Sequence, residues 1–124
     1  MKWPLLVLAV FVMPWTTAQA QQRGPQVSAK EHEGWRQYSV HCARCHGQDV
    51  LGNPVAPDLR KSAAPGGPVE DEPAFAAIVM EGRGGMPGFK GQVSPEQVSA
   101  IHAYAQGRAT DRISGGRPSN PGGG

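Results

Sequence analysis

The run Cys42-Ala43-Arg44-Cys45-His46 sets the strongest limit on how this chain folds, and it holds both cysteines of the 124 residues. Two thiols one helical turn apart can add to the two vinyl groups of one haem. A histidine directly after them then lies beneath the iron, where a neutral imidazole nitrogen can bind it. The pattern therefore predicts one haem c, attached through Cys42 and Cys45, with His46 as an iron ligand.

Three other chemistries use cysteine pairs, and each fits this chain less well. A structural zinc site takes four ligands, usually from two such pairs, and the chain offers one pair. A thioredoxin-like dithiol belongs to a βαβ unit, and no segment alternates in hydrophobicity over a useful length. A disulfide between neighbours three apart would close a very short loop and stabilise little.

The first twenty residues have the pattern of a secretory signal peptide. Lys2 precedes an apolar stretch from Leu5 to Met13, and Ala18-Gln19-Ala20 forms a cleavage site. The alternative is an uncleaved membrane anchor, but the stretch is about half of the ~20 residues that a bilayer span needs. We therefore expect an exported, periplasmic protein with no membrane span in the mature chain.

The mature chain is short of large apolar side chains. Residues 21–124 contain 15 Leu, Ile, Val and Phe, whereas the whole chain has 17 Gly and 12 Pro. Either the chain is mostly loop, or something other than its own side chains fills the core, as a disulfide, a metal or a bound group does in many small domains. The formal net charge of +2 provides no strongly basic face, which argues against a nucleic-acid partner.

Local signals predict three helices. The first begins at Ser28, which has the capping-box pattern. The second has Pro73 in its first turn and ends at Gly82. The third begins after Ser94 and is expected to end at Gly107. We divide the chain into a signal peptide (1–20), a polar lead-in (21–27), a helical domain (28–107) and a disordered tail (108–124).

The helical domain resembles the bacterial class I c-type cytochromes. That resemblance implies an all-α, small cytochrome c fold in which three to four short helices wrap around one covalently attached haem. The first and last helices are then expected to cross, with Tyr104 covering Gly34. The matching features are Gly34, Tyr38 and Cys42 at a spacing of four, the motif 42–47, the segment Ala56-Pro57-Asp58-Leu59, the loop Gly84-Gly85-Met86-Pro87, and the last helix with Ile101 and Tyr104.

The same resemblance implies roles for individual residues. The carbonyl of Pro57 is expected to accept the second ring N–H of His46, and Leu59 to pack against the haem. Met86 is expected to be the sixth iron ligand, because thioether ligation beside histidine is the cytochrome c arrangement. Met80 is the competing thioether, but its place between apolar residues of a helix favours a core role.

Other ligand sets and haem contacts stay open. A second histidine could replace the thioether, and we expect His32 to be exposed, His41 to point away from the haem and His102 to be satisfied locally. The haem propionates need hydrogen-bond donors, and the sequence does not rank the candidates. These candidates are Arg60, Lys61, Arg83 and Trp35.

The function implied by the resemblance is one-electron carriage by a monomeric periplasmic protein that is not an enzyme. Its donors would be a dehydrogenase or a membrane quinol complex, and its acceptor a redox protein such as a terminal oxidase. The first alternative is a haem enzyme or gas sensor in which the sixth ligand is absent or labile. The second is an exported thiol redox protein without haem.

Overall fold

The computed structural model describes residues 27–122, so the expected signal peptide and residues 21–26 of the lead-in lie outside the described part. Within residues 27–122 the secondary structure is helical, with isolated β-bridges and no sheet, which confirms the all-α prediction. There are five α-helices rather than the expected three to four, and two of the five are single turns of four residues. The helices are α1 (Ala29–His41), α2 (Ala43–His46), α3 (Leu59–Ser62), α4 (Glu72–Glu81) and α5 (Pro95–Ala109), with a 3-10 turn η1 (Gln48–Val50) after α2.

The predicted helix starts are confirmed. Ser28 Oγ accepts a hydrogen bond from Glu31 N at 3.2 Å, and the Glu31 carboxylate accepts one from Ser28 N at 2.8 Å. Ser94 and Gln97 form the same reciprocal pair at the start of α5. Such capping satisfies backbone N–H groups that have no partner inside the helix.

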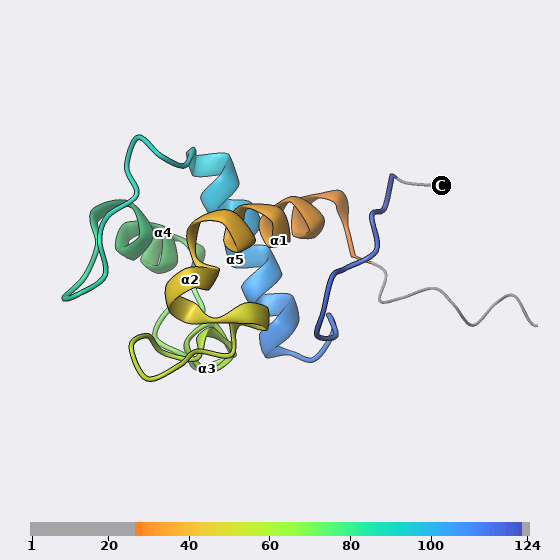
Figure 1. Ribbon diagram of the computed structural model, residues 1–124, viewed down its shortest axis with the longest axis horizontal. Helices are drawn as coiled ribbons and strands as arrows, with labels where there is room; N and C mark the ends of the chain where they lie inside the picture. Colours follow the sequence, from red (N-terminus) through yellow and green to blue (C-terminus); the bar gives the residue numbers. More distant parts are fainter. Residues whose placement is uncertain (1–26, 123–124) are drawn as a thin grey trace, which may run out of the picture.

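Helices α1 and α5 cross at a glycine (Figure 1). A Cβ at Gly34 would overlap the carbonyl oxygen of Ala100 and would lie 2.9 Å from Tyr104 Cβ. One turn further along α1, the rings of Tyr38 and Tyr104 pack with their centroids 5.7 Å apart. The expected cover of Gly34 by Tyr104 is therefore present, and this crossing joins the two ends of the domain.

The last helix and the tail differ from the sequence prediction. Helix α5 continues past Gly107 to Ala109, and a Cβ at Gly107 would lie 2.7 Å from Ile113 Cγ1. This glycine therefore allows close packing by the following segment and does not end the helix. The segment was expected to be disordered from residue 108, yet Ile113 and Pro118 are buried against the domain.

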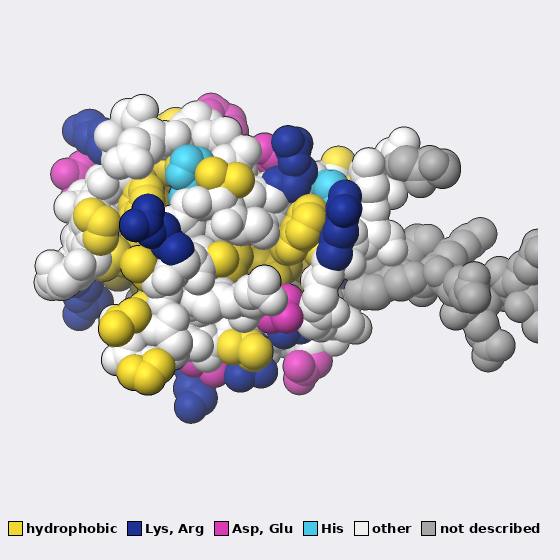
Figure 2. All heavy atoms as spheres, in the orientation of Figure 1, with side chains coloured by type: hydrophobic (Ala, Val, Ile, Leu, Met, Phe, Trp, Pro, Cys, Tyr) yellow, Lys and Arg dark blue, Asp and Glu magenta, His cyan; other side chains and the backbone are white. Residues whose placement is uncertain are grey.

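The remaining elements surround one face of the molecule. In Figure 1, α2 lies in front of α5, α4 lies at one side with the loop that follows it, and α3 lies below. Figure 2 shows apolar side chains gathered across the middle of this face. No helix among residues 27–122 has the length and hydropathy needed to span a bilayer.

Candidate haem site

The Cys42–His46 motif forms a sharp corner after α1. Cys42 N donates to Tyr38 O at 2.8 Å at the end of α1, and His46 N donates to Cys42 O at 2.9 Å within α2. Gly47 then leaves the helix with a positive φ of 77°, a region that favours glycine. The motif is therefore held as one helical turn at a corner of the chain.

The two cysteines of this turn lie in different surroundings. Cys42 is buried, whereas Cys45 is exposed. Burial, together with the neighbouring Cys45, raises the pKa of the Cys42 thiol to about 12. A redox-active dithiol needs a thiol whose pKa is lowered, so these surroundings do not favour the thiol redox alternative.

The His46 ring is fixed by the expected carbonyl. His46 is buried, and its Nδ1 lies 3.0 Å from Pro57 O. Because a carbonyl can only accept, Nδ1 must carry the proton, and the lone pair of the neutral ring is then on Nε2. No described residue hydrogen-bonds to Nε2. With this tautomer Nε2 is free to bind a metal, and the Pro57 carbonyl fixes the orientation of the ring.

Gly52 and Asn53, which the sequence did not single out, hold the backbone of the haem motif. Gly52 N donates to His46 O at 2.7 Å, and Asn53 Nδ2 donates to Cys45 O at 2.6 Å. A Cβ on Gly52 would lie 2.8 Å from the carbonyl carbon of Pro57. Glycine at this position is what lets the Pro57 carbonyl approach His46. In the sequence, the glycine ten residues after Cys42 is the signal that could have indicated this close approach.

The Met86 loop folds back onto the end of α4. Met86 and Arg83 exchange two backbone hydrogen bonds of 3.0 Å, and Phe89 N donates to Val79 O at 2.9 Å. A Cβ on Gly82 would lie 2.6 Å from Met86 O, so this turn also depends on glycine. The loop therefore presents Met86 from a backbone that is tied to α4 on both sides.

Apolar side chains are left partly exposed next to the core, and several of the residues expected to contact the haem are among them. The partly buried residues that pack against the core include Trp35, Leu59, Ile78, Met80, Met86 and Phe89. Burial alone does not separate Met86 from Met80, because both are half-buried. Covering such an apolar surface would stabilise a protein of this size, and a flat apolar ring system could cover it. The residues present therefore fit a haem.

Two of the other histidines and one candidate propionate donor contact other residues of the domain. His102 Nε2 lies 3.1 Å from Val69 O, which agrees with the expected local bond. His32 is half-buried against Trp35 rather than exposed, with ring centroids 5.4 Å apart. Arg60 forms a two-pronged ion pair with Asp58, at 3.1 Å and 2.9 Å.

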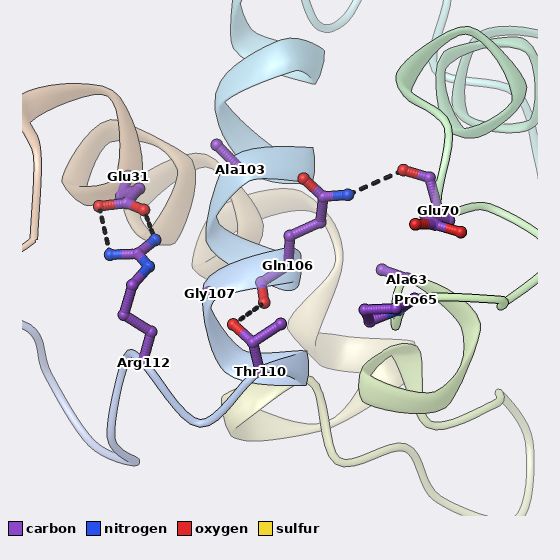
Figure 3. Close-up of a pocket in the computed structure, with 9 residues that line it drawn as sticks. All are labelled: Glu31, Ala63, Pro65, Glu70, Ala103, Gln106, Gly107, Thr110 and Arg112. Carbon is purple, nitrogen blue, oxygen red and sulfur yellow. Dashed lines mark hydrogen bonds and ion pairs between the residues drawn. The ribbon is translucent and has the colours of Figure 1, made fainter.

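A pocket of about 320 Å³ lies away from these residues, between α1, α5 and the segment before α4 (Figure 3). Its polar groups already bind one another. Arg112 pairs with Glu31, and Gln106 Nε2 donates to Glu70 O at 2.8 Å. None of the predicted site residues lines it, so this pocket is separate from the candidate haem site.

The Asp58–Arg60 pair predicts a dependence of stability on pH. Asp58 caps α3, and hydrogen bonds from Arg60 hold the pKa of its carboxyl below the usual range. A lowered pKa in the folded state gives stability that is present above about pH 4 and is lost as the pH falls through the folded value. In Asp58→Asn, which keeps the cap but not the charge, we expect a smaller loss of Tm between pH 5 and pH 2.

Thermal unfolding of the purified protein across this pH range measures the effect. Glu81→Gln is the matched control, because Glu81 pairs with Lys90 at 3.7 Å with both side chains mostly exposed. Equal acid dependence in Asp58→Asn and the parent protein would contradict the prediction.

Comparison with known proteins identifies relatives of the domain that carries these residues. Residues 29–104 match the family described as cytochrome c oxidase, cbb3-type, subunit III. The chain is 37% identical over 86 residues to the quinohemoprotein alcohol dehydrogenase ADH-IIG of Pseudomonas putida, a match that covers 68% of this chain but 11% of that protein. It is 29% identical over 105 residues to cytochrome c6 of Nostoc, covering 85% of this chain and 88% of that protein.

A solved structure supports the same relationship. The c-type cytochrome XoxG from Methylobacterium extorquens AM1 aligns with a TM-score of 0.64 and 26% identity, over 73% of this chain and 57% of that one. The family match spans the residues from α1 to Tyr104, including the motif, the Pro57 segment and the Met86 loop. The chain therefore belongs to this family of cytochrome domains, within the class I c-type cytochromes.

Proposed function

We propose that this protein is a periplasmic one-electron carrier, with a haem c bound covalently by Cys42 and Cys45 and ligated by His46 and Met86. The observation that carries the proposal is the His46 ring, whose Nδ1 is engaged by Pro57 O at 3.0 Å while its Nε2 has no partner among the described residues. Bound there, the haem iron supplies the one-electron chemistry, at a potential raised by thioether ligation.

The chain's own residues have positioning and covering roles in this proposal. Pro57 fixes the tautomer and the orientation of the His46 ring. The hydrogen-bonded Gly82–Phe89 loop holds the Met86 sulfur in place. Leu59 and the other half-buried apolar residues exclude water from the ring system, which limits the reorganisation that accompanies electron transfer. If His46 and Met86 both held the iron, oxygen and peroxide could not bind it, which is the arrangement of a carrier rather than of a haem enzyme or gas sensor.

The partners of such a carrier are other redox proteins. We propose a dehydrogenase or a quinol complex as donor and a terminal oxidase as acceptor, with the protein acting as a monomer. The relatives named for alcohol dehydrogenase and for cytochrome c oxidase support these classes. The signal-peptide pattern of residues 1–20 supports export to the periplasm.

Covalent attachment is tested by denaturing electrophoresis of the purified protein followed by haem staining and a pyridine haemochrome spectrum. We expect stain to remain with the chain, and to be lost in a Cys42→Ala, Cys45→Ala double variant. Arg44→Gln, which changes an exposed residue between the two cysteines, is the matched control and should retain the stain. A parent protein without covalent haem and with two titratable thiols would instead support the thiol redox alternative.

A further inference from the structure

The segment after α5 returns across the domain as a strap, which we define as residues 110–118. Ile113 is fully buried, and Pro118 is buried near its end. Arg112 forms an ion pair with Glu31 of α1, and the Arg117 guanidinium lies 5.5 Å from the centre of the Trp35 ring. The strap is therefore anchored to α1 at two points and to the core at a third.

The strap also contacts the loop that follows the haem motif, defined here as the proximal loop (residues 47–52). Its backbone is unusual, because Asp49 and Val50 have φ values of 58° and 57°. Residues other than glycine rarely adopt φ values in this region, and a β-branched valine is especially disfavoured there. Such a conformation persists only where surrounding contacts hold it.

Arg108 links the strap to this loop. Its side chain is buried, its Nε donates to Asp49 O at 3.3 Å, and its Nη1 donates to Ile113 O at 2.7 Å. The strap adds a second bond, because Gly116 N donates to Asp49 Oδ1 at 2.9 Å. A buried guanidinium that binds two backbone carbonyls ties the strap to a loop that lies 59 residues before Arg108 in the sequence.

The proximal loop in turn holds His46. Gly52, at its end, donates to His46 O at 2.7 Å and lies against the Pro57–Asp58 peptide. We propose that Arg108 and the strap are positioning elements, a role that rests on the proposed function. They hold the proximal loop, and the loop in turn keeps the His46 ring oriented toward the iron. The haem site of this chain then depends on residues that lie beyond the segment 29–104 matched by the family.

The test compares Arg108→Gln with the haem-bearing parent protein. Amide hydrogen exchange at Gly52 reports the loop directly, and the reduction potential reports the iron ligand. We expect exchange at Gly52 to become about tenfold faster or more, together with a shifted potential. Arg108→Lys keeps the charge and a hydrogen-bond donor, so its Gly52 exchange rate and its reduction potential should stay close to those of the parent. Arg117→Gln is the control, because this exposed arginine of the strap contacts Trp35 and not the loop.

A truncated chain ending at Asp111 provides a second variant, because it leaves the loop and Arg108 intact while removing Ile113 and Gly116. It should reproduce both effects of Arg108→Gln. If both variants melt at lower temperature but keep the parent's Gly52 exchange and potential, the strap stabilises the fold without positioning His46. A parent without covalent haem contradicts the proposed function itself. If the parent carries haem and both variants have its Gly52 exchange rate and its reduction potential, only the positioning role is contradicted.

Discussion

Replacing Met86 with alanine is expected to convert a closed haem site into one that binds carbon monoxide rapidly and completely in the reduced state. The thioether would be the sixth ligand, and alanine offers no atom that can bind iron. The reduction potential should also fall, because thioether ligation favours the reduced iron. Absorption spectra before and after addition of carbon monoxide, with a potentiometric titration, measure both effects.

Met80→Ala is the matched control for this variant. Met80 is likewise half-buried against the core, but it lies on α4 rather than in the loop. It should lose some stability and keep the parent spectrum and potential. If Met80→Ala binds carbon monoxide and Met86→Ala does not, Met80 is the ligand. If neither variant differs from the parent, the sixth ligand is not a thioether: a parent that does not bind carbon monoxide would then point to a histidine, and one that does would point to an open position.

The second large effect is expected at Gly34, where α1 crosses α5. In an isolated helix, changing glycine to alanine stabilises by about 1 kcal/mol. Here the added Cβ would overlap the Ala100 carbonyl, a backbone atom that cannot move without displacing α5. Overpacking of this kind costs about 3 kcal/mol, so steric overlap outweighs helix propensity. We expect Gly34→Ala to lower the Tm by about 10 °C or more, and Gly34→Leu to reduce the yield of folded protein.

Thermal unfolding of the haem-bearing protein measures this loss. Gly122→Ala is the control, because a Cβ at Gly122 meets only Asn120 Oδ1, at 3.8 Å, and no positive φ is required there. An unchanged or higher Tm in Gly34→Ala would show that the helices can separate at the crossing without cost.

Local chemistry made several of the helix boundaries predictable. Ser28 and Ser94 cap α1 and α5 as expected, and Gly82 follows α4, because each signal acts within one helical turn. The single-turn helices α2 and α3 were missed, since four residues are too few to establish a periodic pattern. Gly107 was misjudged because its role depends on Ile113, a contact that only the folded tail provides.

The candidate site shows the same division between local and distant information. The Cys42–His46 motif stands out in the sequence because its spacing carries the chemistry. The approach of Pro57 O to His46 was implied by the family resemblance and is present as a 3.0 Å contact. The contact between Arg108 and Asp49 could not be predicted, since neither residue type indicates a partner 59 positions away.

The crossing of α1 and α5 also has a consequence for the order of events during synthesis. Helix α1 emerges early, but its packing partner is complete only at Ala109, so the domain cannot close until nearly the whole chain is available. Until then the cysteine motif lies in an open chain. Cys42 is only 9% exposed once the domain closes. Cys45 stays exposed in the closed domain, so we expect haem attachment through Cys42, rather than through Cys45, to require that it precede the docking of α5 on α1.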